Sequence, residues 1–269
     1  MLTALASIAV PYCAAPHVCE ELACWSISIR RVHFCALSNI GCVRQHTDCR
    51  QARFYNRRTM CFSAFASFSA GVALLVIGGD SARRTRHAAE LPYALIPLLF
   101  GVQQLLEGGL WLTLAEPQQC LSALLTQGYS AFSQVIWPIY IPLAVYLLEP
   151  SGLRRYAMAV IAVGGAAVSL YLLWYMVHVP VVAQVSGQHI AYIFPHFHQP
   201  LATVLYLFAA CVSPLISSWP RVRLFGVLAS LSLLATAYFY AQWFISTWCF
   251  FAALLSTVVW LQFADAKRR

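Results

Sequence analysis

Long apolar runs separated by short polar turns make up the chain from Met60 to its end. A helix needs about 20 predominantly apolar residues to cross the hydrocarbon core of a bilayer, and seven segments meet or approach that length. We therefore predict a bundle of seven membrane-spanning helices. The predicted spans are residues 62–79, 91–114, 129–148, 156–177, 201–218, 224–240 and 243–263.

The junction between the last two predicted spans is short, because only Ala241 and Gln242 separate the two apolar runs. A single helix through both runs would hold about 40 residues and extend roughly 60 Å. That length is about twice the thickness of the hydrocarbon core. The pattern therefore predicts two helices joined by a tight turn.

Every lysine and arginine after Met60 falls into one of four short clusters, which follow the first, third, fifth and seventh predicted spans. The loops between them carry neither residue. Because Lys-rich and Arg-rich short loops stay on the cytoplasmic side, we predict an all-α fold: an integral membrane seven-helix bundle in the plasma (inner) membrane, N-terminus outside and C-terminus cytoplasmic. The clusters are Arg83/Arg84/Arg86, Arg154/Arg155, Arg221/Arg223 and Lys267/Arg268/Arg269.

The composition supports a chain whose main partner is the lipid bilayer. Hydrophobic residues make up 61% of the sequence, charged residues 10%, and the mean hydropathy is +0.69. Soluble domains are nearer 45–50% apolar and roughly 25% charged. The formal net charge of +8 lies in short loops beside the spans rather than in a basic patch interleaved with aromatic residues. We therefore expect no nucleic-acid partner.

Residues 1–59 differ from the rest of the chain. They hold six of the ten cysteines and contain one glycine and no lysine, and their apolar residues follow no sustained period. We interpret this segment as a non-native or disordered extension, with the protein starting at Met60 and residues 60–269 forming the transmembrane domain. A disulfide-rich extracellular arm and a cytosolic regulatory arm remain alternatives.

Three stretches carry a resemblance to a known family: Met60-Cys61-Phe62-Ser63, Gln103-Gln104-Leu105-Leu106-Glu107-Gly108, and Trp248-Cys249-Phe250-Phe251-Ala252-Ala253. Together they resemble an uncharacterised bacterial family of multi-spanning membrane proteins, a domain of unknown function. Its members begin Met-Cys-Phe-Ser and carry a Gln-Gln-Leu-Ile-Glu-Gly span and a Trp-Cys-Phe-Phe-Ala-Ala span. The resemblance covers Met60 to about Phe263 and implies a membrane class but no activity.

Glu107 is the main candidate for chemistry inside the membrane. A carboxylate in a span costs roughly 2.5–3.5 kcal/mol on insertion scales, so it must face the bundle interior. Gln103 and Trp111 lie four residues before and after it, on the same helix face. We predict a ligand-binding site formed by Gln103, Gln104, Glu107, Trp111 and Tyr140, with a purely structural polar clamp as the alternative. Gly101 and Gly108 would let a neighbouring helix approach closely.

A second set of candidates lies toward the outer side. His178, His189, His196 and His198 fall at or after the end of the fourth span, and with Glu107 they offer ligands for a metal or haem. No motif requires a cofactor, and solvated loop histidines are the alternative. Two of the cysteines Cys61, Cys120 and Cys249 could also form a disulfide, because an outer compartment is oxidising.

These features leave three functions open. We favour a non-enzymatic protein that binds or senses a small molecule through the polar interior around Glu107. A metal-dependent membrane enzyme with an outward-facing Glu/His site and a proton-coupled transporter are the alternatives. Pro138 and Pro142 remove two helix donors in the third span, as in the broken helices of transporters, but a simple kink explains them equally. The chain shows no internal repeat of the kind transporters carry.

Overall fold

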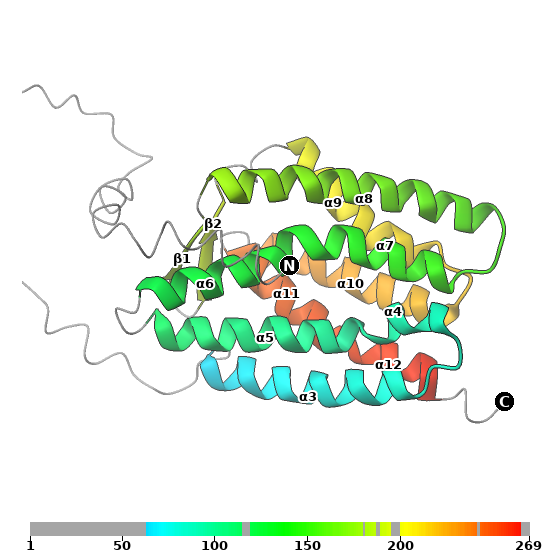
Figure 1. Cartoon of the computed structure of the whole chain (residues 1–269), viewed down its shortest axis with the longest axis horizontal. Helices are drawn as coiled ribbons and strands as arrows, with labels where there is room; N and C mark the ends of the chain where they lie inside the picture. Colours follow the sequence, from blue (N-terminus) through cyan, green and yellow to red (C-terminus); the bar gives the residue numbers. More distant parts are fainter. Residues whose placement is uncertain are drawn as a thin grey trace, which may run out of the picture.

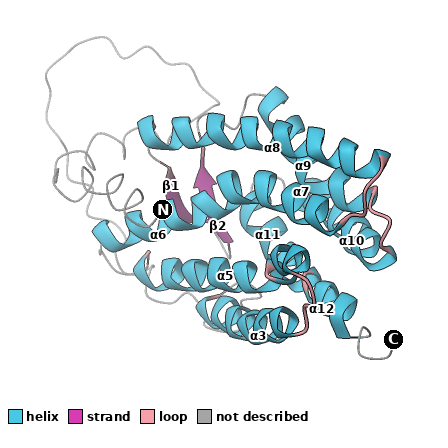
Figure 2. Ribbon diagram, turned by 45° about the vertical axis from the view of Figure 1, so that its right-hand side comes forward, coloured by secondary structure: helices cyan, strands magenta, loops and turns pink. Residues whose placement is uncertain are grey.

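The computed structural model describes residues 63–114, 119–179, 181–186, 189–194, 200–240 and 243–264. Within these residues the chain forms a bundle of helices with one small β-hairpin at one end (Figures 1 and 2). The helices are α3 (Ala64–Arg83), α4 (Leu91–Ala94), α5 (Ile96–Thr113), α6 (Gln119–Ser130), the π-helical η4 (Ala131–Ile136), α7 (Trp137–Leu148), α8 (Leu153–His178), α9 (Pro200–Leu215), α10 (Pro220–Phe239), α11 (Phe244–Leu255) and α12 (Thr257–Ala264), with a 3-10 turn, η3 (Ala88–Glu90), before α4.

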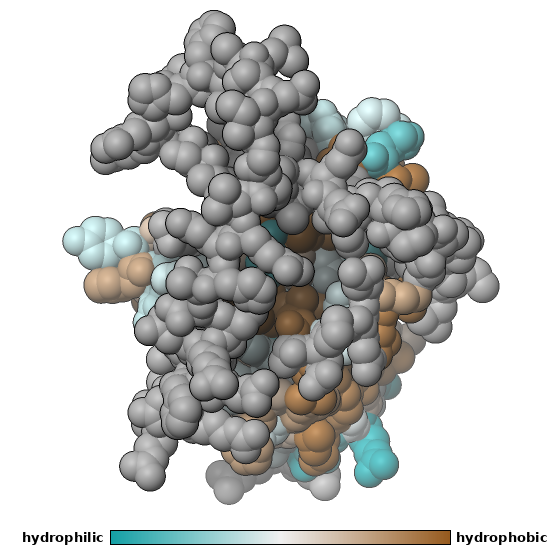
Figure 3. All heavy atoms as spheres, turned by 90° about the vertical axis from the view of Figure 1, so that its left-hand side faces the viewer, coloured by the Kyte–Doolittle hydropathy of each residue, from teal (hydrophilic) through white to brown (hydrophobic). Residues whose placement is uncertain are grey.

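Six helical stretches of the described chain are long and apolar enough to cross a membrane, as expected for a multi-pass membrane protein. The break between α10 and α11 confirms that the last two predicted spans are separate helices. Large apolar side chains on the outside of the bundle include Phe65, Val163 and Leu234. In Figure 3, which views the bundle from its hairpin end, brown, hydrophobic residues show on one side of the described part.

Two predicted spans have different limits in the structure. The third runs from Cys120 to Leu148, so it begins earlier than the predicted residue 129. Its first turns carry polar side chains, such as Gln127, that are buried in the bundle. The fifth is the shorter helix α9, which has 16 residues. The hydropathy pattern therefore gave the wrong start for the third span, which has polar residues on its buried face, and the wrong end for the fifth span.

Glu149, a buried glutamate at the end of α7, holds the loop that follows α9. Glu149, 3% exposed, accepts a hydrogen bond of 2.9 Å from the Ser217 hydroxyl and bonds of 3.0 and 3.1 Å from the Ser218 backbone N–H. The indole N–H of Trp219 donates to the Leu148 carbonyl at 3.2 Å. These contacts hold the turn between α9 and α10 against the end of α7.

A β-hairpin that sequence analysis did not predict lies between α8 and α9. Its antiparallel strands are β1 (Val182–Ser186) and β2 (His189–Ile193), paired from Val182 opposite Ile193 to Ser186 opposite His189. It stands at the end of the bundle opposite the basic loops (Figures 1 and 2). The prediction of an all-helical chain therefore holds for the spans but not for this loop.

Glycines allow α3 and α5 to pack closely, as predicted for Gly101 and Gly108. A Cβ on Gly101 would lie 2.9 Å from the carbonyl oxygen of Gly71, and a Cβ on Gly108 would lie 3.0 Å from the ring of Phe68. Small residues at such positions let two helix backbones approach in a bilayer. This contact fixes the rotation of α5 and points Glu107 away from α3, toward the interior.

Pro138 and Pro142 have no backbone N–H, so each leaves a carbonyl group of the third span without its helical hydrogen bond. Neighbouring helices cover these carbonyl groups. Pro138 follows the π-helical segment η4, and the Ser133 carbonyl in that segment accepts a hydrogen bond of 2.7 Å from the Tyr206 hydroxyl. The carbonyl of Pro138, four residues before Pro142, lies against Gly165 of α8, where a Cβ would come within 1.9 Å of its oxygen. The structure therefore shows a kink that neighbours stabilise.

Candidate functional site

Helix α5 carries the predicted polar residues into the centre of the bundle. Gln103 and Gln104 are fully buried and Glu107 is 2% exposed. Trp111, one turn further on, is only partly buried. The ring of Tyr140 meets the edge of Trp137 with centroids 6.4 Å apart, and its hydroxyl donates to the Pro92 carbonyl at 2.8 Å, in the short helix α4. In this structure Tyr140 therefore joins α7 to α4.

Glu107 is bound by a side chain from the far end of the sequence. The Ser246 hydroxyl of α11 donates to Oε1 of Glu107 at 2.5 Å. The carboxyl group is also close enough to interact electrostatically with Tyr129, Tyr192 and the Cys249 thiol. The only ion pair among the described residues joins Arg84 to Asp80. Glu107 thus has polar neighbours but no basic side chain beside it in the described chain.

One turn further into the bundle, Gln103 binds the indole of Trp137. The Trp137 N–H donates to Oε1 of Gln103 at 2.7 Å, and its ring stacks on Phe100 with centroids 3.9 Å apart. This hydrogen bond fixes the Trp137 side chain between α5 and α7. The signal in the sequence was the Trp137-Pro138 pair, which pointed to a kink but not to this contact.

Several fully buried polar atoms near Glu107 have no hydrogen-bond partner among the described residues. A buried donor or acceptor left without a partner costs about 1–3 kcal/mol, so such a group is retained only where it serves a purpose or meets a partner from outside the polypeptide. The polar cluster around Glu107 therefore has hydrogen-bonding capacity to spare. These atoms include Oε1 of Gln104 and the hydroxyl of Tyr192, whereas the Gln104 side chain also interacts with the Glu107 carboxyl group, and Gln103 and Tyr129 interact with the Cys249 thiol.

The β-hairpin covers one end of this polar cluster. Tyr192 of β2 stacks on Tyr129 with ring centroids 4.5 Å apart and planes at 6°. His189 stacks on Trp243 at 4.5 Å and meets the edge of Tyr240. Burial raises the pKa of Tyr192 well above its usual range, with smaller contributions from Glu107 and Cys249. Burial lowers the pKa of His189 below its usual 6.5.

The histidines do not assemble with Glu107 in the described chain. His178 is exposed and its Nδ1 lies 2.7 Å from the Trp174 carbonyl, whereas His189 is buried between aromatic rings. His196 and His198 lie outside the described residues. Within those residues, no group of three His, Cys, Asp or Glu side chains is placed to hold a metal ion. A metal or haem site at these residues therefore stays a prediction without a described ligand set.

The cysteines named for a disulfide have different states. Cys249 carries a free, buried thiol, so it does not form the predicted bridge in this structure. Cys120 is disulfide-bonded, and Cys61 lies outside the described residues. The thiol of Cys249 instead lies between the polar cluster and the cavity beneath it.

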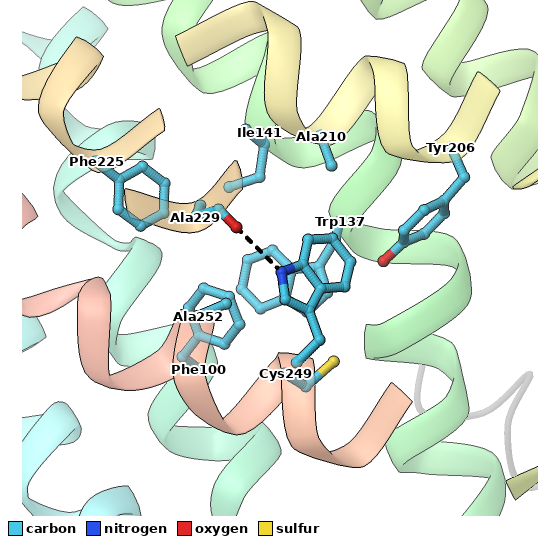
Figure 4. Close-up of a pocket in the computed structure, with 10 residues that line it drawn as sticks. Phe100, Trp137, Ile141, Tyr206, Ala210, Phe225, Ala229, Cys249 and Ala252 are labelled. Carbon is cyan, nitrogen blue, oxygen red and sulfur yellow. Dashed lines mark hydrogen bonds between the residues drawn. The ribbon is translucent and has the colours of Figure 1, made fainter. Parts of the chain in front are cut away.

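An apolar cavity lies deeper in the bundle, among α5, α7, α9, α10 and α11 (Figure 4). Five of its wall residues are aromatic, and the side chains labelled in Figure 4 surround one space. Trp137 and Cys249 belong both to this wall and to the surroundings of Gln103 and Glu107. The lining residues are Phe100, Trp137, Ile141, Tyr206, Ala210, Phe225, Ala229, Trp248, Cys249 and Ala252.

Sequence analysis missed several members of this site. Ser246 lies inside an apolar run, where a single hydroxyl looks like a helix-compatible small residue. Tyr192 lies in a loop that showed no strand signal, and Tyr129 was placed at the start of a span. The buried Gln127 and Gln134, seven residues apart in the third span, were the signal that this span has a polar interior face.

Comparison with known proteins gives a family but no activity. A model for a family of unknown function, DUF6629, matches residues 60–269, and the chain belongs to that family. No curated protein and no solved structure matches the chain. The resemblance stated from the three sequence motifs is thereby confirmed at the level of the family, whereas the division of the chain at Met60 stays a prediction.

Proposed function

We propose that this member of the DUF6629 family binds a small amphipathic molecule, with its apolar part in the aromatic cavity and its polar part near Gln103 and Glu107. The observation that carries the proposal is the contiguity of the two regions. Trp137 and Cys249 line the cavity and also contact or face the polar cluster. Small-molecule sites combine mostly apolar walls with a few convergent polar groups.

A structural clamp alone does not account for every buried polar atom near Glu107. A clamp would pair Glu107 and Gln103 with other side chains, and it does so for one oxygen of each residue. The Oε1 atom of Gln104 and the Tyr192 hydroxyl remain without a described partner. A bound hydroxyl, amide or amine would satisfy these groups and recover part of the cost of burying them.

Thermal unfolding of the purified full-length chain in mild detergent tests this proposal. The probes are alcohols, amines and carboxylic acids of four to eight carbons. We expect at least one class to raise the Tm of the native chain, because a ligand that binds only the folded state stabilises it. Glu107→Gln keeps the side-chain shape and should reduce this shift, and Ala252→Leu, which fills the cavity, should abolish it.

Glu149→Gln is the matched control, since it changes another buried glutamate at the opposite end of α7 from the cavity. This variant should have a lower starting Tm, because Glu149 holds the α9–α10 turn, but an unchanged response to the probes. The proposal is wrong if no probe stabilises the native chain, or if all three variants respond as the native chain does.

Proton-coupled transport is a second candidate, favoured by the environment of Glu107. A carboxyl group without a basic neighbour in the described chain can exchange protons, and Tyr129 and Tyr192, which stack on each other beneath the hairpin, interact electrostatically with it. Intramembrane carboxyl groups of this kind serve as proton relays in transporters. Uptake of the stabilising probe into proteoliposomes should then depend on a pH gradient and on Glu107; uptake insensitive to both would exclude this function.

We also place the protein in the plasma (inner) membrane of a bacterium, with its basic end in the cytoplasm. The loops after α3, α7 and α9 gather at one end of the bundle (Figure 1), and the described arginines lie in these loops or in the helix turns beside them. Fluorescence of a green fluorescent protein fused to the C-terminus tests the orientation, because this reporter folds in the cytoplasm. A dark C-terminal fusion together with an active periplasmic reporter would reverse the proposed topology.

A further inference from the structure

We propose that the cavity is selective for a compact quaternary ammonium group, so that the natural ligand is an organic cation rather than a neutral molecule or a primary amine. This inference rests on the proposed function and names the chemical class that the same site takes. It follows from two properties of the wall: what the aromatic rings offer to a ligand, and which charge lies next to them.

The hydrogen-bonding groups of the wall are already used. The Trp137 N–H donates to Gln103, the Trp248 N–H to the Ala229 carbonyl at 3.4 Å, and the Tyr206 hydroxyl to the Ser133 carbonyl at 2.7 Å. The dashed line in Figure 4 marks the Trp248 contact. These rings therefore present carbon surfaces to the cavity, and a primary ammonium, which needs acceptors for three N–H groups, would find none on them.

Aromatic surfaces without free donors suit a cation whose charge is covered by methyl groups. Tryptophan, tyrosine and phenylalanine rings attract cations through the negative faces of their π systems, and quaternary ammonium groups are recognised in cages of such rings. Phe100, Trp137, Tyr206, Phe225 and Trp248 come from five different helices and surround one space. Rings on five helices form a cage rather than a single stack.

The carboxyl group of Glu107, when ionised, would supply the matching negative charge. It does not line the cavity, and it lies one helical turn from Gln103 and two turns from the wall residue Phe100, or roughly 6 Å and 10 Å of rise along α5. A negative charge near the wall, with an effective dielectric constant near that of a protein interior, favours a cation over a neutral ligand. The carboxyl group has no basic neighbour among the described residues, so a bound cation would be its partner.

Three probes of similar size separate these contributions. Choline carries a trimethylammonium group, 3,3-dimethyl-1-butanol is its uncharged carbon isostere, and ethanolamine carries a primary ammonium instead. Binding to the full-length chain in detergent is measured by quenching of tryptophan fluorescence and by calorimetry. We expect choline to bind at least tenfold more tightly than either of the other two, a difference of about 1.4 kcal/mol.

Two variants assign this preference to its causes. Glu107→Gln should reduce choline binding about tenfold and leave binding of the carbon isostere unchanged. Trp248→Leu keeps an apolar wall but removes one ring, and should weaken choline more than the isostere. Glu149→Gln should change neither, because this carboxyl group lies at the other end of α7.

The outcomes distinguish this inference from the proposed function. Equal affinity for choline and its carbon isostere, both sensitive to Ala252→Leu, would overturn selectivity for a cation while the cavity remained a binding site. Ethanolamine binding as tightly as choline would point to direct hydrogen bonding at the carboxyl group and would overturn the aromatic cage. Binding of none of the three probes would also overturn the inference, and the panel of alcohols, amines and acids would then decide the proposed function independently.

Discussion

Gly164 and Gly165 are adjacent in α8, and the structure predicts opposite effects when each is changed to alanine. A Cβ on Gly165 would lie 1.9 Å from the carbonyl oxygen of Pro138, whereas a Cβ on Gly164 would have no atom within 4 Å. Ordinary contact begins near 3.4 Å, so Gly165→Ala must push α7 and α8 apart by about 1.5 Å or distort one of them. The Pro138 carbonyl belongs to backbone next to Trp137, so the strain would reach the cavity wall.

The magnitude follows from two opposing effects. Overpacking a tight contact costs about 1–3 kcal/mol, whereas replacing a helical glycine by alanine gains up to about 1 kcal/mol from backbone entropy. Gly164→Ala should therefore be neutral or stabilising, and Gly165→Ala should be less stable than Gly164→Ala by about 1–3 kcal/mol. For a chain of this size that difference corresponds to roughly 2–12 °C in Tm.

Thermal unfolding followed by intrinsic tryptophan fluorescence measures both variants in the same detergent. The order of Tm is the decisive result, since the two substitutions share composition and position in the helix. Equal Tm values, or a lower Tm for Gly164→Ala, would show that the close contact between α7 and α8 is wrong. The interpretation of Pro138 as a kink covered by its neighbours would then fail as well.

Three further predictions concern single contacts. Ser246→Ala should lower the free energy of unfolding by about 1–3 kcal/mol because it removes the described hydrogen bond to Glu107. Thr247→Val removes a hydroxyl without a described partner and should be nearly neutral. Equal losses of stability in thermal unfolding of the two variants would contradict this prediction. Ser217→Ala should loosen the turn held by Glu149 and increase amide exchange at Ser218, and unchanged exchange would refute the anchor. Because burial lowers the pKa of His189, the closed hairpin is fully stable above pH 6.5 and loses stability as the pH falls through the lower pKa of the folded state. Amide exchange in β1 and β2 should therefore rise in acid in the native chain, and His189→Phe should remove that dependence. The same rise in His189→Phe would contradict the assignment to His189.

The spans were predictable because bilayer thickness and hydrophobic length are linked by simple geometry. The interior position of Glu107 was predictable for a similar reason, since a carboxyl group in lipid is costly and Gln103 shares its helix face. The close approach at Gly101 followed from the absence of a side chain. Each of these inferences depends on residues that are near one another in the sequence.

The rest of the site depends on contacts that no local pattern encodes. Ser246 meets Glu107 across 139 positions, and Tyr192 reaches Tyr129 only because a loop folds into a hairpin over the bundle. The buried Gln127 made the third span look too polar to begin where it does. The contact of the Tyr140 hydroxyl with the Pro92 carbonyl, next to the break between α4 and α5, was likewise not visible in any local pattern.

The central claim is that the cavity beneath Glu107 binds small amphipathic molecules, and photolabelling tests it most directly. The full-length chain in mild detergent would be irradiated with an octanol that carries a diazirine, and labelled residues would be identified by mass spectrometry. We expect saturable labelling of cavity residues such as Trp137, Trp248 and Cys249, displaced by excess unlabelled octanol and lost in Ala252→Leu. Labelling confined to outward-facing residues such as Phe65 and Val163, with no saturation, would contradict the claim.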